Sequence, residues 1–180
     1  MVAVMPSVSA SLRMASFSSA VHVLRCFMVQ IYGFGLVEFL LHSFRGLRSA
    51  YLSLQSALNY HGLIPEFSPH LTFITSRKTF RLSFQNRLFI YRHLRADLFA
   101  GYALENGLRI AFPEKALLDL LWLETTQNNV IPYLEELRLN TSVLAQIVDP
   151  QRFEALVGLF GNTPKIQQAH QWILNEALNP

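Results

Sequence analysis

The sequence predicts an α+β domain, in which a small antiparallel sheet packs with helices and a helical hairpin lies at the C-terminus. Three observations support this prediction. Apolar and polar residues alternate from Phe80 to Gln85, which is the pattern of a half-buried strand. Asn106-Gly107 separates two short apolar segments, which indicates a β-hairpin. Asp149-Pro150 and Thr163-Pro164 each precede apolar residues at helical spacing.

The composition of the chain is that of a folded protein. Of its 180 residues, 51% are hydrophobic and 15% are charged, which excludes a disordered chain and permits a sizeable core. Cys26 is the single cysteine, so an internal disulfide and a cysteine-based zinc site are excluded. A single cysteine suits a reducing compartment, and we expect a cytoplasmic protein.

We expect a domain boundary near residue 50, with an atypical apolar segment over residues 1–49 and the α+β domain over residues 50–180. Val21–Phe44 is almost continuously apolar. Its uncharged part, Cys26–Val37, is too short to cross a bilayer, and a longer span would include Arg25 or Glu38. We therefore expect a helix that is buried or covered by a partner. A membrane-associated helix and an irregular conformation are the alternatives.

The domain begins with a short helix and continues as strands. Ser53 is a candidate N-cap for a helix that carries Leu54, Ala57 and Leu58 on one face, and Gly62 supplies the left-handed residue that commonly follows a helix. About four or five antiparallel strands should follow. The predicted strands are Leu71–Thr75, Phe80–Gln85, Leu88–His93, Tyr102–Glu105 and Leu108–Phe112.

Helices complete the chain. Pro113 suits the first turn of a helix, and Asp119 is the only polar residue between Ala116 and Leu123, so this helix should be buried on most sides. The last two helices should begin at Asp149-Pro150 and at Thr163-Pro164, and Gly161-Asn162 joins them. They should therefore form an antiparallel hairpin.

The sequence contains no motif that points to catalysis. It has no glycine-rich phosphate loop, no nucleophile elbow and no histidine pair at metal-ligand spacing. We therefore assign no catalytic residue, no metal site and no cofactor. His61 is interpreted as a capping or core residue at a helix end, and His93 as part of a basic surface.

Glu114, Lys115 and Asp119 allow two interpretations. They could belong to a metal-dependent nuclease, which would need a further acid on a neighbouring strand, and the preceding strands offer only Glu105. The preferred interpretation is an acid at the start of a helix beside a solvated lysine.

One charged segment predicts a binding surface. Six basic residues and no acidic residue lie between positions 77 and 95, and we call them the basic strip: Arg77, Lys78, Arg81, Arg87, Arg92 and Arg95. The predicted strands place some of them among Phe84, Phe89 and Tyr91. Basic side chains beside aromatic rings suit a phosphate backbone or an acidic protein surface. A solvated sheet face is the alternative.

The order and spacing of several segments resemble a known family. The segments are Tyr51–Ile64, Tyr91–Leu94, Leu98–Tyr102 and Ala111–Leu120. Together they resemble the AbiEi-type antitoxins, which are transcriptional regulators of bacterial abortive-infection (type IV) toxin–antitoxin systems. The resemblance extends from about Tyr51 to the C-terminus.

The resemblance implies a two-part protein. An N-terminal winged helix-turn-helix would bind operator DNA, and the C-terminal domain would neutralise a nucleotidyltransferase-type toxin encoded alongside. Met1–Ser49 contains no recognisable recognition helix, so we expect the DNA-binding module to be truncated or replaced. We therefore expect a phage-defence antitoxin whose basic strip binds the toxin, with duplex DNA as a second candidate partner. The alternatives are a metal-dependent nucleic-acid-processing enzyme and a membrane-tethered adaptor.

Overall fold

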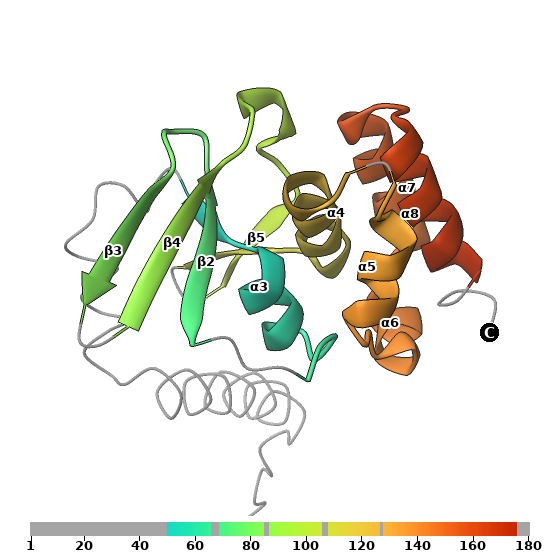
Figure 1. Ribbon diagram of the computed structural model, residues 1–180, viewed down its shortest axis with the longest axis horizontal. Helices are drawn as coiled ribbons and strands as arrows, with labels where there is room; N and C mark the ends of the chain where they lie inside the picture. The colour runs from blue at the N-terminus through green and yellow to red at the C-terminus, as the bar shows by residue number, and fades with distance from the viewer. Residues whose placement is uncertain (1–49, 66–68, 85–86, 106–107, 127, 176–180) are drawn as a thin grey trace, which may run out of the picture. The chain divides into compact units, whose positions relative to one another are not determined.

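The computed structural model describes residues 50–65, 69–84, 87–105, 108–126 and 128–175 (Figure 1). The chain divides into two units, Met1–Arg45 and Gly46–Pro180, and the described residues all belong to the second. The predictions for Val21–Phe44 and for the Asn106-Gly107 turn fall outside the described residues.

A six-stranded mixed sheet forms one layer of this unit, in the order β3-β4-β2-β1-β6-β5. The strands are β1 (Ala50–Leu52), β2 (His70–Thr75), β3 (Phe80–Phe84), β4 (Arg87–His93), β5 (Tyr102–Glu105) and β6 (Leu108–Ala111). The helices are α3 (Leu54–Tyr60), the 3-10 helix η2 (Ala96–Leu98), α4 (Pro113–Glu124), α5 (Val130–Glu136), α6 (Thr141–Ile147), α7 (Pro150–Phe160) and α8 (Pro164–Ile173). This arrangement confirms the predicted α+β class.

The sheet differs from the prediction because it is not antiparallel throughout. The hairpins β3–β4 and β5–β6 are antiparallel as predicted, but β2 pairs with β4 and β1 pairs with β6 in parallel. The strand that sequence analysis missed is β1, which lies at the centre of the sheet. Its three residues are all apolar, so they show neither the alternation nor the length that identifies a strand.

The ends of the helices follow local rules only in part. Thr163, which the sequence placed as the N-cap residue of α8, occupies that position, but its side chain makes no capping hydrogen bond. Gly62 adopts a φ of +72° just after α3, as predicted, because glycine adopts the left-handed region without a steric penalty. The Asp149 side chain accepts hydrogen bonds from the backbone N–H groups of Gln151 and Arg152 at the start of α7. Ser53 occupies the N-cap position of α3, but its side chain does not cap the helix. Its hydroxyl instead bonds to α4, as described below.

The core lies between the sheet and the helices, and α4 is at its centre (Figure 1). α4 contacts α3 and β6 on one side and α7 and α8 on the other. Leu117, Leu118, Leu120 and Leu121 are each at most 1% exposed. The prediction that this helix is buried on most sides is therefore confirmed.

Candidate functional site

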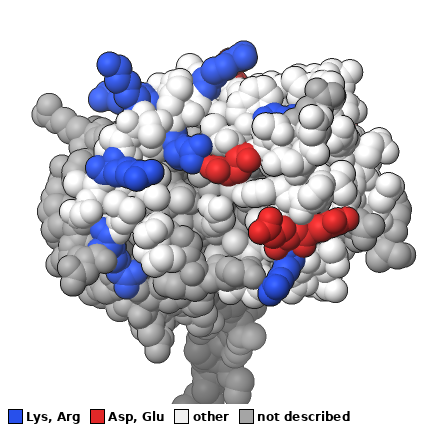
Figure 2. All heavy atoms as spheres, viewed as in Figure 1, with Lys and Arg blue, Asp and Glu red and all other residues white. Residues whose placement is uncertain are grey.

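Two residues of the basic strip lie on one face of the outer part of the sheet. The register pairs Arg81 with Ile90, and Arg92 with Ile74. Because neighbouring paired residues point to the same face, Arg81 and Arg92 share a face with Ile74. This is the face that α3 and α4 cover over the middle of the sheet. Figure 2 shows the molecule from the same side as Figure 1. Most of the Lys and Arg side chains visible there lie on the side of the molecule where β3 and β4 are found.

The remaining members of the basic strip point elsewhere. Arg87 is paired with Phe84 and shares the face of Phe89 and Tyr91, opposite to Arg92. Arg77 and Lys78 lie in the connection between β2 and β3, and Arg95 follows β4. The six residues therefore do not form one continuous row. They surround the β3–β4 end of the sheet.

Two arginines of the strip are paired with acids that lie outside the segment from 77 to 95. Nη1 of Arg92 lies 2.6 Å from Oε1 of Glu124, at the C-terminal end of α4. Arg95 binds Asp97 through both its Nε and Nη2 atoms, and the hydrogen bond from Arg95 lowers the pKa of the Asp97 carboxyl. These acids neutralise part of the strip locally. The positive charge is thus concentrated on Arg77, Lys78 and Arg81, which are exposed and have no acidic partner among the described residues.

Two of the aromatic residues expected beside Arg81 and Arg92 lie on the other face of the sheet. Phe89 and Tyr91 are 0% and 1% exposed and lie on the sheet face opposite to Arg81 and Arg92. The expectation was wrong for these two residues because side chains alternate along a strand, so neighbours in sequence point to opposite faces. On β4, the residues that share the face of Arg92 are Leu88 and Ile90, which are half-buried, and on β2 the exposed His70 lies opposite Leu88. This face is therefore mainly basic and aliphatic.

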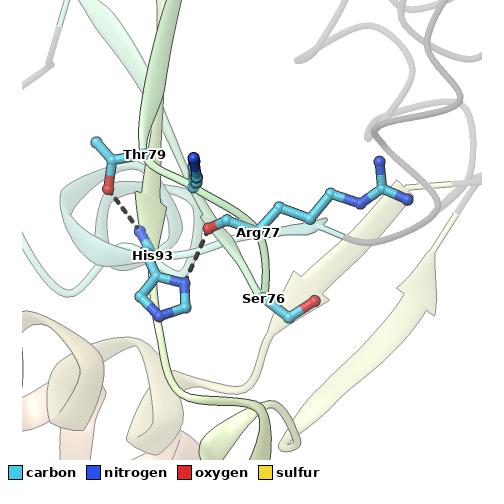
Figure 3. Close-up of a pocket in the computed structure, with 5 residues that line it drawn as sticks. Ser76, Arg77, Thr79 and His93 are labelled. Carbon is cyan, nitrogen blue, oxygen red and sulfur yellow. Dashed lines mark hydrogen bonds between the residues drawn. The ribbon is translucent and has the colours of Figure 1, made fainter.

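An open hollow of about 610 Å³ lies at the turn between β2 and β3 (Figure 3). It is lined by Ser76, Arg77, Lys78, Thr79 and His93. The backbone N–H of His93 donates to Oγ1 of Thr79 at 3.1 Å, and its ring Nδ1–H donates to the carbonyl oxygen of Arg77 at 2.8 Å. These bonds fix the turn against the end of β4, so the backbone that carries Arg77 and Lys78 is held in place. His93 is exposed beside the basic residues, as the sequence indicated.

The second candidate site, Glu114 with Lys115 and Asp119, lies in the interior. Glu114 is 1% exposed, and Lys115 and Asp119 are 0% exposed. The interpretation of Lys115 as a solvated neighbour is wrong. Lysine is almost never fully buried unless it is paired, and here Nζ of Lys115 forms an ion pair with Asp119 one helical turn later. The i,i+4 spacing of these two residues in the sequence is the signal that could have identified the pair.

Residues of β1 and its junction with α3 complete this polar cluster. The Tyr51 hydroxyl donates to Oδ2 of Asp119 at 2.9 Å and accepts a hydrogen bond from Nζ of Lys115 at 2.9 Å. The Ser53 hydroxyl donates to the same Oδ2 atom at 2.8 Å. Burial raises the pKa of Asp119 and lowers the pKa of Lys115, and the charge of each residue opposes the shift of the other. Every polar atom of the cluster is engaged within the protein.

Glu114 has a separate structural role. Its carboxylate accepts hydrogen bonds from Nε and Nη2 of Arg152 at 3.1 and 2.9 Å, and from the backbone N–H of Asp149 at 2.6 Å. These bonds join the start of α4 to the start of α7. In the part of the chain that the structure describes, no group of three or more His, Cys, Asp or Glu residues is arranged to hold a metal ion. The three residues of the nuclease alternative thus contact other parts of the fold through hydrogen bonds and ion pairs.

His61 has the structural role that its place in the sequence suggested. It is the C-cap residue of α3, and its ring Nε2–H donates to the carbonyl oxygen of Ala111 on β6 at 2.8 Å. Burial lowers the pKa of His61 below its ordinary value, while the bond to Ala111 acts in the opposite direction. His61 thus connects the end of a helix to a strand fifty residues later.

Comparison of the chain with protein-family models, with curated proteins and with solved structures finds no match. The resemblance to AbiEi-type antitoxins therefore stands as a prediction. Among the helices of the described residues, none has the length and apolar character needed to cross a membrane.

Proposed function

We propose that this chain is a cytoplasmic, antitoxin-like regulator that acts by binding another macromolecule. The observation that supports the proposal is the exposed basic group formed by Arg77, Lys78 and Arg81 at the β3 end of the sheet. These residues have no acidic partner among the described residues, whereas the buried charges of Glu114, Lys115 and Asp119 are all paired inside the fold. Charge that is not used within the protein is available for a ligand of opposite sign.

The proposed partner is a nucleotidyltransferase-type toxin. This part of the proposal rests on the resemblance of Tyr51–Ile64 and the later segments to AbiEi-type antitoxins. Duplex DNA is the second candidate, since exposed arginine and lysine also bind phosphate groups. Leu88 and Ile90 favour the protein partner, because a protein surface can cover half-buried aliphatic side chains and a phosphate backbone cannot. We propose no catalytic activity for the chain.

Rescue of growth tests the proposal. The full chain would be co-expressed with a nucleotidyltransferase-type toxin encoded beside it, and growth would be compared for the unchanged protein and the double variant Arg77→Glu with Arg81→Glu. We expect the unchanged protein to restore growth and the double variant to lose much of this effect. Arg138→Glu is the matched control, because Arg138 is exposed and follows α5, away from the basic strip.

The same proteins would be titrated with duplex DNA of the chain's own upstream region and with a scrambled duplex. The proposed function fails if neither toxin rescue nor DNA binding depends on Arg77 and Arg81. Rescue without DNA binding supports the toxin as the partner, and DNA binding without rescue supports the second candidate.

A further inference from the structure

The outer edge of β3 is a free sheet edge in the described part of the chain. β3 stands at the end of the strand order, and no described strand lies beyond it. A strand in this position presents alternating backbone N–H and C=O groups that its single neighbour cannot pair. The opposite edge is β5, so the sheet offers two positions at which a further strand could add.

β3 lacks two of the features with which proteins usually block such an edge, namely a proline and a β-bulge. Its sequence, Phe-Arg-Leu-Ser-Phe, contains no proline. Its register with β4 is continuous from Phe80–Tyr91 to Phe84–Arg87, without the extra residue of a β-bulge. The one charged residue of the strand is Arg81. β3 is therefore regular enough to pair with another strand.

One face of β3 carries a fixed apolar contact. The ring of Phe80 stacks on that of Tyr91, with centroids 4.2 Å apart and an interplanar angle of 6°, and Tyr91 stacks in turn on Phe73 at 5.0 Å. Phe80 nevertheless remains 38% exposed. A side chain that is held in place and still exposed loses little conformational entropy when a partner covers it.

The other face and the preceding turn carry positive charge. Arg81 points to the face opposite to Phe80, and Arg77 and Lys78 immediately precede the strand. A strand added beside β3 would therefore meet an apolar contact on one face and basic side chains on the other. Alternating acidic and apolar side chains complement this pattern, since residues of a strand point to the two faces in turn.

These charges also decide between the candidate occupants of the edge. A second copy of this chain would add further positive charge to this edge, and its β3 contains no acidic residue that could pair with Arg81. A nucleic acid has no backbone donors and acceptors at the spacing of a β-ladder. A protein segment supplies both the ladder and the acidic side chains.

We infer that the outer edge of β3 accepts an extended acidic segment of a partner protein as an additional strand. The inference rests on the proposed function, because it states how the partner binds the basic group at the β3 end of the sheet. The backbone ladder would supply affinity, and the alternation of Phe80 and Arg81 would select an apolar–acidic sequence.

Synthetic peptides test this inference on the full chain. The probes are fluorescent peptides of about eight residues in which glutamate or aspartate alternates with valine, isoleucine or phenylalanine. Each is matched by two peptides of the same sequence, with N-methyl groups on the odd-numbered or on the even-numbered residues. One of the two lacks the donors that face β3, and both keep every charge in place. Binding would be followed by fluorescence anisotropy, and the protection of the Phe80–Phe84 amides by hydrogen exchange.

We expect at least one unmodified peptide to bind and to protect the β3 amides. We expect one of the two N-methylated forms to bind at least about tenfold more weakly, because two or three backbone hydrogen bonds are lost. Arg81→Glu and Phe80→Ala should weaken binding, whereas Arg138→Glu should not. Unchanged thermal melting of each variant would show that the fold is intact.

Three outcomes overturn the inference, and they separate its failure from that of the proposed function. Equal binding of N-methylated and unmodified peptides would show a contact of charges without a ladder, and the proposed function would stand. Binding of duplex DNA with no binding of any peptide would also leave the proposed function standing, with DNA as the partner. If peptide binding, DNA binding and toxin rescue were all independent of Arg77 and Arg81, both the inference and the proposed function would fail.

Discussion

Tyr51, on the central strand β1, donates a hydrogen bond of 2.9 Å to Asp119 on α4. Ser53 makes a second bond to the same carboxylate, and Lys115 pairs with it from one turn earlier in the helix. Ser53 joins β1 to α3, and Leu54, the first residue of α3, adopts a φ of +57°, which is unfavourable for a residue other than glycine. The buried charge pair of α4 thus holds a strained connection in place.

Asp119→Asn should therefore destabilise the protein by about 3–5 kcal/mol, because it leaves Lys115 buried without a partner of opposite charge. Asparagine keeps the size of the side chain, so the loss reports on the charge and not on a cavity. The free energy of unfolding would be measured by urea titration. Glu136→Gln, an exposed residue of α5, is the control and should change stability by less than about 0.5 kcal/mol.

The double variant Lys115→Met with Asp119→Leu provides a further check. It removes both charges and keeps the interior apolar, so it should cost less than the sum of the two single changes. Additive effects would show that Lys115 and Asp119 do not act as a pair.

Leu121→Ala should cost about 2–5 kcal/mol, because Leu121 is 0% exposed on the most buried helix and its loss leaves a cavity. A denaturant titration of the full chain measures the change. Leu159→Ala, on an exposed position of α7, serves as the control and should cost much less, since Leu159 is 38% exposed. A loss below about 1 kcal/mol for Leu121→Ala would mean that α4 is peripheral to the core.

The parts of the fold that sequence analysis identified are those whose signals are local. Strand β3 alternates apolar and polar residues, β4 is a short apolar segment that follows a turn, and α7 begins with its own capping aspartate. β1 could not be identified in this way, because its partners lie on β2 and β6, and long-range pairing determines its central position. α5 and α6 were also missed. The side chain of Asn140 caps α6 by accepting from the N–H of Val143, a signal that was available but short.

The same distinction applies to the candidate site. The basic residues of the strip were visible in the sequence, because charge does not depend on the fold. The sequence did not show which basic residues form ion pairs. Arg92, for example, pairs with Glu124 on α4, which lies thirty-two residues later in the chain. Strand alternation could have shown that Tyr91 and Arg92 point to opposite faces. Strand alternation was therefore sufficient for that correction, whereas the pair of Arg92 with Glu124 required the tertiary structure.

His61 should make stability depend on pH. Burial holds the pKa of His61 below its unfolded value of 6.5, so below about pH 6.5 the unfolded chain binds more protons than the folded one. The neutral, buried His61 therefore stabilises the fold fully above about pH 6.5. This stabilisation is lost as the pH falls through the pKa of His61 in the folded protein. Urea titrations from about pH 8 to pH 5 would compare the unchanged protein with His61→Gln. The difference in free energy of unfolding between the two proteins should shrink as the pH falls. A difference that stays constant over this range would contradict the prediction.

The last prediction concerns the unequal weight of the arginines in the basic strip. Arg81→Gln should weaken binding of the acidic partner more than Arg95→Gln, because Arg95 is already paired with Asp97, whereas Arg81 has no acidic partner among the described residues. Both changes remove one positive charge from an exposed side chain, so net charge cannot explain a difference. The effect of Arg81→Gln should also decrease as salt rises from about 50 to 200 mM, since exposed charges are screened. Titration of the full-length variants with the acidic peptides and with duplex DNA, at both salt concentrations, measures this. Equal losses for the two variants would show that binding depends only on total charge, and that the ion pairs of the β3–β4 end have no part in selecting the contact.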